Sequence, residues 1–315
     1  MEKYPGIEKI YDDIQKLNIQ GATNVCIATF EALKLYIQSS KEQDKDLFYK
    51  EFVEMGERLS LARMNEPLAR NGIKYVKYFF KEQFSVLPEL STMKRELNEL
   101  CDKYLDIVEQ SKKDLVQKSS GFLSNLDKVF THCHSSTVVE LIVSISKGDK
   151  NFEVVCTETR PLYQGRITAK SLLNAGIKTT MIADSAGESF IIGRGSVPVD
   201  VVFIGCDQIT SKGHAINKIG SWGLGVAAHY MGKPFYVVTP LLKMDTESFI
   251  HDVKIEVRED AELWKEAPKG LEMFNPAFEI VDNTLITGYV TELGIIKPSD
   301  TDRVVRESYP WLLKD

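Results

Sequence analysis

Hydrophobic and polar positions in the first third of the chain alternate with the period of a helix. The apolar positions nearest the N-terminus recur three or four residues apart, which places them on one helical face: Ile7, Ile10, Tyr11, Ile14 and Leu17. The same pattern predicts further helices over about 23–39, from about residue 45 and from about residue 91. Ser119-Ser-Gly121 then breaks it. We therefore expect an all-helical N-terminal domain over residues 1–120.

A different pattern occupies residues 121–315. Short runs rich in β-branched residues recur there, each followed by a helix-like stretch: 128–131, 153–157, 178–183, 200–205, 235–239 and 285–290. Continuous apolar strands that alternate with helices are typical of a parallel sheet covered on both faces. The pattern predicts an α/β fold, with a parallel-sheet C-terminal domain after the helical one.

Composition narrows the function classes. The chain has 315 residues, 43% of them hydrophobic, and a net charge of −6. An acidic balance argues against non-specific binding to nucleic acid or to a membrane surface. No apolar run is long enough to span a bilayer, and the N-terminus lacks the apolar segment of a signal peptide. We expect a cytoplasmic protein.

The cysteines and histidines favour neither a disulfide framework nor a metal site. The five cysteines are scattered and lack C-x-x-C spacing: Cys26, Cys101, Cys133, Cys156 and Cys206. His132 and Cys133 are adjacent on a predicted strand and so point to opposite faces. Neither a G-x-G-x-x-G after the first strand nor a P-loop lysine motif is found. We expect no metal and no nucleotide cofactor.

Two reactive side chains stand where predicted strands end. Cys133 ends the run 128–133, and Asp207 ends the run 200–207. In an open α/β sheet, ligands bind beyond the carboxyl ends of the strands. A thiol at a helix start has a lowered pKa, and a carboxylate after a buried strand has a raised one. The pair predicts acid/base chemistry; the alternatives are a small buried cysteine and an aspartate that caps a turn.

Groups suited to binding an anion follow the same strands. Free N–H groups at a helix start and arginine side chains both bind phosphate well. The alternative is an ordinary surface loop with solvated arginines. The residues predicted to bind a small anionic substrate here are His134, Ser135, Arg160, Gln164, Asn217 and Lys218.

In this order and spacing, these segments resemble one family, which holds ribose-1,5-bisphosphate isomerases, methylthioribose-1-phosphate isomerases and the alpha, beta and delta regulatory subunits of translation initiation factor 2B. The resemblance extends from about Gly21 to about Ile296 and is closest to the archaeal ribose-1,5-bisphosphate isomerases. The segments that carry it are Thr131-His-Cys-His-Ser135, Thr157-Glu-Thr-Arg-Pro161, Gln164-Gly165, Thr168-Ala-Lys170, Gly205-Cys-Asp207, Ile216-Asn-Lys-Ile-Gly220, Asn275-Pro-Ala-Phe278 and Thr291-Glu-Leu-Gly-Ile-Ile296.

The resemblance implies a Rossmann-like C-terminal domain without a nucleotide cofactor, and assembly as a homodimer or a dimer-based hexamer. It also implies that Cys133 and Asp207 are catalytic. The regulatory subunits generally lack that pair, so its presence favours an enzyme. The activity implied is that of an aldose–ketose isomerase acting on a sugar 1-phosphate, with ribose 1,5-bisphosphate converted to ribulose 1,5-bisphosphate.

Two segments depart from the family pattern. The isomerases usually carry Arg-Gly-Ala near the N-terminus, whose arginine contacts a substrate phosphate, and this chain has Gln20, Gly21 and Ala22. The segment from Arg63 to Arg70 also differs, and either arginine, Arg160 or Lys218 is a candidate to replace the missing cation. A regulatory subunit that senses a phosphorylated metabolite and a methylthioribose-1-phosphate isomerase stay open as alternatives.

Overall fold

The computed structural model describes residues 4–84, 89–123, 125–146, 151–248 and 253–313. The chain packs as two compact units, one of residues 1–110, 242–246 and 303–315 and one of residues 111–241 and 247–302. The boundary expected at residue 120 coincides with the end of helix α5, Leu90–Ser120. The packing divides the chain earlier, inside α5, because Leu115 is buried in the core around the sheet.

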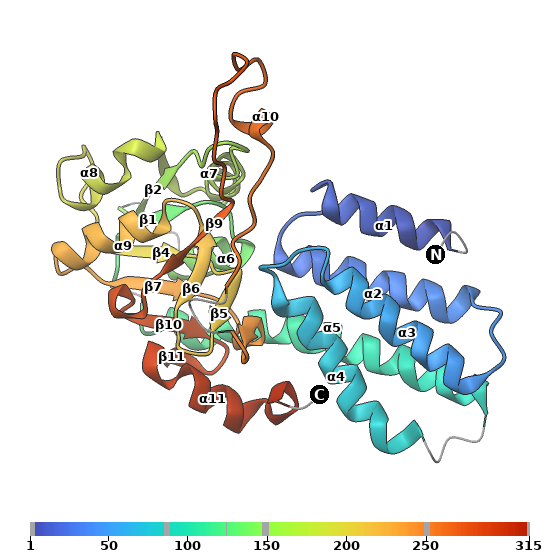
Figure 1. The fold of residues 1–315 in the computed structure, drawn as a ribbon. Coiled ribbons are helices and arrows are strands. Elements are labelled where there is room, and N and C mark those ends of the chain that lie inside the picture. The colour runs from blue at the N-terminus through green and yellow to red at the C-terminus, as the bar shows by residue number, and fades with distance from the viewer. Residues whose placement is uncertain (1–3, 85–88, 124, 147–150, 249–252, 314–315) are drawn as a thin grey trace. The chain divides into compact units, whose positions relative to one another are not determined.

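The first unit is helical, as the sequence pattern predicts (Figure 1). Its elements are α1 Pro5–Gln15, α2 Ala22–Ser39, α3 Lys45–Ser60, α4 Pro67–Phe84 and the first part of α5, with the short returning segments β8 Met244–Asp245 and η5 Pro310–Leu313. The rings of Phe30 and Tyr104 stack in its core, 5.3 Å apart. A Cβ on Gly72 would lie 2.4 Å from Tyr104, so glycine lets α4 approach these rings.

The second unit is built on a seven-stranded sheet in the order β11-β10-β7-β4-β1-β2-β3. All neighbours pair in parallel except β10 and β11. The Rossmann-like α/β class expected for this part of the chain is therefore confirmed. The strands are β1 Lys128–His132, β2 Glu153–Thr157, β3 Lys178–Ile182, β4 Val201–Ile204, β7 Phe235–Val238, β10 Gly288–Thr291 and β11 Gly294–Ile296.

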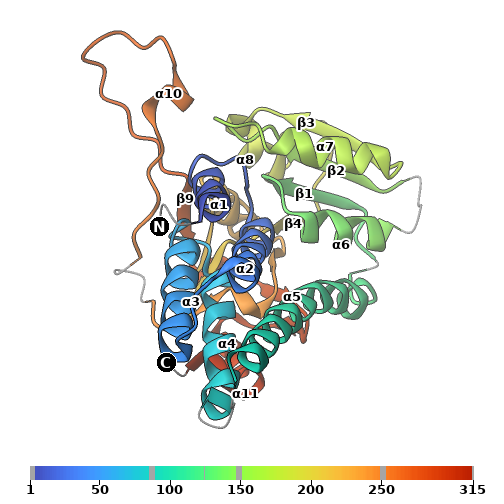
Figure 2. The same cartoon turned by 90° about the vertical axis from the view of Figure 1, so that its right-hand side faces the viewer.

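Helices cover both faces of this sheet, because alternate residues of its central strands are apolar on each side. Val129 of β1 belongs to the core under α6, whereas Phe130 lies on the opposite face, beside Gly187 of α8. Figure 2 shows α6 and α7 beside β1, β2 and β3. The helices and single turns of this unit are α6 Ser136–Ser146, α7 Gly165–Asn174, η1 Asp184–Ala186, α8 Gly187–Ile191, α9 Ser221–Tyr230, η3 Asn283–Leu285 and η4 Pro298–Asp300. The last helix, α11 Thr301–Ser308, belongs to the first unit from Arg303 on.

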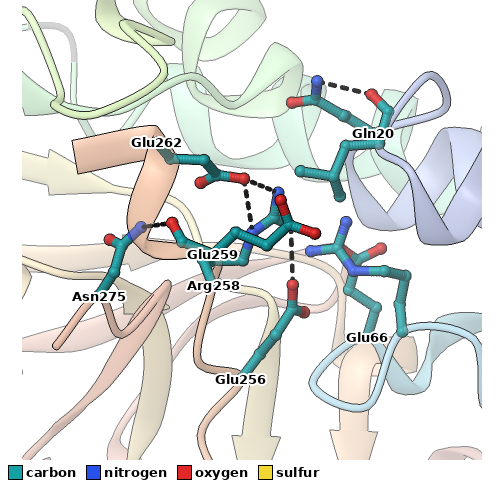
Figure 3. Close-up of polar contacts among 9 residues, drawn as sticks. Gln20, Glu66, Glu256, Arg258, Glu259, Glu262 and Asn275 are labelled. Atoms are coloured by element: carbon teal, nitrogen blue, oxygen red, sulfur yellow. Dashed lines mark hydrogen bonds and ion pairs between the residues drawn. The ribbon is translucent and has the colours of Figure 1, made fainter. Parts of the chain in front are cut away.

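A smaller antiparallel sheet follows β4 in the second unit. It pairs β5 Gln208–Thr210 with β6 Ala215–Lys218, and β6 with β9 Phe278–Val281. An extended arm precedes β9 and carries the short helix α10, Asp260–Leu263 (Figure 1). Arg258 in this arm binds the carboxylates of Glu256 and Glu262 (Figure 3). Within the described ranges, no helix is long and apolar enough to cross a membrane.

The strand order locates the point where a ligand is expected. From β1 the chain moves to β2 and β3 on one side, and then returns to β4, β7 and β10 on the other side of β1. The direction of winding therefore reverses between β1 and β4. Open α/β sheets bind their ligands beyond the carboxyl ends of the strands at this switch point.

Candidate active site

Cys133 and Asp207 lie on the two sides of the switch point. His132 pairs in register with Ile204, so the chain continues into Cys133 after β1 and into Gly205 and Asp207 after β4. A Cβ on Gly205 would lie 2.9 Å from the Cβ of Ser135, which shows how closely the two loops pack. Asp207 and Lys218 are both close enough to Cys133 to change the pKa of its thiol. The structure thus brings these three predicted residues together.

The backbone of Cys133 is held in an uncommon conformation. Its φ of 66° lies in the left-handed region, which costs a residue with a side chain roughly 1–2 kcal/mol. Two threonine hydroxyls clamp it: the Cys133 N–H donates to Thr159 Oγ1 at 3.0 Å, and Thr168 Oγ1 donates to the Cys133 carbonyl at 2.8 Å. Both threonines are buried. The clamp fixes the direction in which the thiol points.

Burial raises the pKa of the Cys133 thiol to about 11. The carboxylates of Asp207 and Asp184 also raise it, whereas the Lys218 ammonium and the His134 N–H lower it. The expectation of a lowered pKa at this helix start is therefore wrong. The free energy lost by desolvating the thiolate exceeds the stabilisation that the helix N-terminus and Lys218 give it. The thiol is therefore protonated at neutral pH.

His132 is a site residue that sequence reasoning did not select. Its buried ring lies between Thr157 Oγ1, 2.6 Å from Nδ1, and the carbonyl oxygen of Ile219, 2.8 Å from Nε2. Burial lowers the pKa of His132, which keeps the ring neutral. A carbonyl only accepts, so the hydrogen bonds assign the proton to Nε2, and Nδ1 accepts from Thr157. The one available signal was strand alternation, which places His132 on the sheet face opposite Thr131.

The loop after β2 is organised by Asp184, another residue that the motifs did not reveal. Its carboxylate accepts the N–H groups of Thr159 at 2.7 Å and of Arg160 at 2.6 Å. The Arg160 guanidinium is exposed and donates to the Tyr163 hydroxyl and, at 3.1 Å, to the Leu263 carbonyl. Arg160 is therefore engaged with its own loop and with the arm. A role in binding substrate stays a prediction.

Gln164 immediately precedes α7 and is partly buried. Its Oε1 atom is buried and finds no hydrogen-bond partner among the described residues. A buried acceptor without a partner costs about 1–3 kcal/mol, which suits a group that accepts a hydrogen bond from a ligand. Gly165 fixes this turn, because a Cβ there would lie 1.8 Å from the Thr157 carbonyl oxygen.

His134 and Ser135 serve the start of α6. Ser135 Oγ accepts from the Val138 N–H at 3.4 Å, as expected of a capping residue. His134 Nδ1 lies 3.0 Å from Thr168 Oγ1. Since that hydroxyl gives its proton to the Cys133 carbonyl, His134 must donate to it. Burial and the nearby Lys112 lower the pKa of His134.

The segment that holds Asn217 and Lys218 leads into the start of α9. The Trp222 N–H donates to Glu279 Oε1 at 2.8 Å, so a carboxylate of the chain already occupies this helix N-terminus. Burial raises the pKa of Glu279. Asn217 Nδ2 donates to Ser221 Oγ at 2.8 Å, which ties the end of β6 to the first residue of α9. Lys218, 4.9 Å above the Phe278 ring, is left as the cation that this segment offers the site.

The remaining predicted residues belong to the first unit. Gln20 Nε2 donates to the Leu17 carbonyl at 2.8 Å (Figure 3), and Gly21, with φ 85°, precedes Ala22 at the start of α2. Arg63 pairs with Glu66 at 3.0 Å in a buried contact. Arg70 pairs with Asp245 at 3.4 Å. Their role toward a substrate stays a prediction.

Comparison with known proteins identifies the family. The model of the initiation factor 2 subunit family matches residues 18–298. The chain belongs to this family. Among curated relatives, it is 28% identical to the ribose 1,5-bisphosphate isomerase of Methanocaldococcus jannaschii, covering 98% of this chain and 97% of the relative. It is 30% identical to the methylthioribose-1-phosphate isomerase of Symbiobacterium thermophilum, covering 94% of this chain and 85% of the relative.

A solved family structure has the same fold. The 5-methylthioribose 1-phosphate isomerase of Pyrococcus horikoshii aligns with a TM-score of 0.76 at 26% identity, covering 96% of this chain and 86% of that one. In the described ranges of the present chain, histidine, cysteine, aspartate and glutamate side chains form no group of three able to hold a metal ion.

The raised thiol pKa predicts slow, steeply pH-dependent alkylation of Cys133. The shift from an ordinary value of 9.0 to about 11 lowers the thiolate fraction at neutral pH about a hundredfold. The rate with iodoacetamide should rise about tenfold per pH unit between about pH 7 and about pH 10. Mass spectrometry would assign the modified residue, with Cys133→Ser as the control. A rate that levels off below about pH 9 would contradict the raised pKa.

Proposed function

We propose that this chain is an aldose–ketose isomerase that converts ribose 1,5-bisphosphate to ribulose 1,5-bisphosphate. Its curated relatives are named as isomerases of ribose 1,5-bisphosphate, methylthioribose 1-phosphate and 5-deoxyribose 1-phosphate, all of them sugar 1-phosphates. The observation that supports it most is that Cys133 and Asp207 follow the neighbouring strands β1 and β4 at the switch point of the sheet. A thiol and a carboxylate there are suited to moving protons on one small substrate.

The chemistry requires two proton transfers. A phosphate on C1 locks the sugar as a ring, so the bond between C1 and the ring oxygen must break first, with a proton delivered to that oxygen. The C2 proton must then leave and return at C1 through an enolate-like intermediate, while the C2 hydroxyl becomes the ketone. General acid/base groups contribute roughly 10²–10⁴-fold each to such steps.

The protonated thiol sets the order of events that we propose. Asp207 takes the Cys133 proton and passes it to the ring oxygen, which opens the ring. The thiolate, stabilised by Lys218, then removes the C2 proton and returns it to C1. Asp207 finally accepts the proton of the C2 hydroxyl and returns it to sulfur. The protein therefore ends in its starting state, and the fixed direction of the Cys133 thiol keeps one base near both C1 and C2.

We assign the binding of the substrate phosphates to charged and polar groups around Cys133 and Asp207. Lys218 provides a cation beside Cys133, and the Ser135-capped start of α6 provides N–H groups with the positive end of the helix dipole. The free acceptor of Gln164 suits a sugar hydroxyl.

Replacing either reacting group should abolish turnover. We expect Cys133→Ser and Asp207→Asn each to lower kcat by roughly 10²–10⁴-fold with the fold and phosphate affinity retained. Appearance of the ketose from ribose 1,5-bisphosphate measures kcat, and circular dichroism checks the fold.

Matched controls come from residues of the same type elsewhere. Cys26→Ser replaces a buried cysteine of the first unit, and Asp200→Asn replaces the aspartate at the other end of β4, which accepts from the Lys128 N–H. Both should retain turnover. Activity of either site variant within tenfold of the parent would refute the assigned roles. Binding of the sugar phosphate without turnover by the parent protein would instead favour a regulatory subunit.

The missing N-terminal arginine predicts relaxed selectivity among sugar 1-phosphates. Charge-assisted contacts are about twice as strong as neutral ones, so Gln20 should weaken the hold on one phosphate. Gln20→Arg is expected to raise kcat/KM for ribose 1,5-bisphosphate relative to methylthioribose 1-phosphate and 5-deoxyribose 1-phosphate. Gln15→Arg, an exposed position on α1, is the control. An unchanged ratio in Gln20→Arg would mean that this position does not contact the phosphate.

We also propose that the chain assembles as a homodimer or as a dimer-based hexamer. Along α9, Trp222, Val226 and Tyr230 are exposed apolar residues four positions apart, and the opposite face of the helix is buried on the sheet. A helix that is apolar on all sides is normally covered. Light scattering should give a dimeric or hexameric mass, which Val226→Lys should lower. A monomeric mass at every concentration would contradict the assembly.

A further inference from the structure

His132 links the two loops that carry Cys133 and Lys218. It is the last residue of β1, directly before Cys133, and its Nε2–H donates to the Ile219 carbonyl, directly after Lys218. The residue after Ile219 also lies close to the ring, since a Cβ on Gly220 would be 3.2 Å from His132. The φ of 104° at Gly220 allows this approach.

The other ring nitrogen is fixed by a chain of hydroxyls. The Cys133 N–H donates to Thr159 Oγ1 at 3.0 Å, Thr159 Oγ1 lies 3.2 Å from Thr157 Oγ1, and Thr157 Oγ1 lies 2.6 Å from His132 Nδ1. With Nε2 protonated, each group in this series of hydrogen bonds donates once. The bonds run from the Cys133 N–H through Thr159 and Thr157 to His132, and from His132 to the Ile219 carbonyl. The ring is therefore held in one orientation and one tautomer.

We propose that His132 is a positioning residue that holds the Lys218 loop beside Cys133 through its Nε2 contact with the Ile219 carbonyl. The inference rests on the proposed function only in taking Cys133 as the reacting residue. Among the residues that the structure describes, the charged side chains that act on the Cys133 thiol are Lys218 at the end of β6, Asp207 after β4 and Asp184 in η1. Lys218 is the one cation among them, so the thiolate depends on where this loop is held.

The experiment asks whether the effect of Lys218 on Cys133 depends on His132. The measured quantity is the rate of Cys133 alkylation by iodoacetamide at a fixed pH below the thiol pKa, with and without Lys218→Met. Removing the ammonium should slow alkylation of the parent protein several-fold. Because each comparison is made within one background, changes in the accessibility of Cys133 cancel, and the remaining difference measures coupling.

Two substitutions of His132 separate its two nitrogens. In His132→Gln the side-chain amide extends to the Nε2 position and can still donate to Ile219, so Lys218→Met should slow alkylation as it does in the parent. In His132→Asn the amide reaches only the Nδ1 position, so Lys218→Met should have no further effect. His229→Asn, at an exposed histidine of α9, is the matched control and should behave as the parent.

The effect of Lys218→Met on the alkylation rate in each background either supports or overturns the positioning role of His132. An equal effect of Lys218→Met in the parent and in His132→Asn would overturn it, as would no effect in the parent. If His132→Asn does not fold, Gly220→Asn disturbs the same contact from the loop side, since asparagine tolerates positive φ, and the Lys218 effect should again be lost. Alkylation needs no substrate, so a failure of the isomerase assignment would leave this result unchanged.

Discussion

The hydrogen bonds on the two sides of the Cys133 peptide are the constraint on which the site depends. Thr159 accepts its N–H and Thr168 donates to its carbonyl, and both hydroxyls are buried, where an unpaired polar group is costly. Because Thr159 follows β2 and Thr168 lies in α7, the clamp fixes three segments relative to one another. A left-handed residue at the end of a strand is stable only when its surroundings determine it in this way.

The same burial that makes these hydrogen bonds effective also controls the chemistry. Desolvation raises the pKa of the Cys133 thiol and lowers the pKa of His132, because each charged form loses hydration. The low local dielectric also strengthens the influence of Lys218 and Asp207. A thiol of raised pKa beside a cation and a carboxylate can be deprotonated when the substrate binds, without a permanent thiolate that would be open to oxidation.

The contacts of the predicted site residues show what a local sequence motif does not reveal. The Arg160 guanidinium bonds Tyr163 and the Leu263 carbonyl, and its role toward a phosphate stays a prediction. At the start of α9, the carboxylate of Glu279 accepts the Trp222 N–H. Leu263 and Glu279 are distant in the sequence from the groups that they bind, and no local pattern reveals them as partners. His132 and Asp184 show the opposite case, because ordinary residue types acquire a role from the loops that they join.

The sequence by itself determined the class of the fold, the order of its strands along the chain and the family. Periodicity is a local property, so the helices before residue 120 and strands such as β1 and β4 follow from it. Motif order likewise marked Cys133 and Asp207. Only the tertiary structure decided how the strands are arranged, and hence that β1 and β4 are neighbours at the switch point. It also decided the thiol pKa and the chain of hydroxyls to His132, because burial and hydrogen-bond partners depend on residues that meet only when the chain is folded.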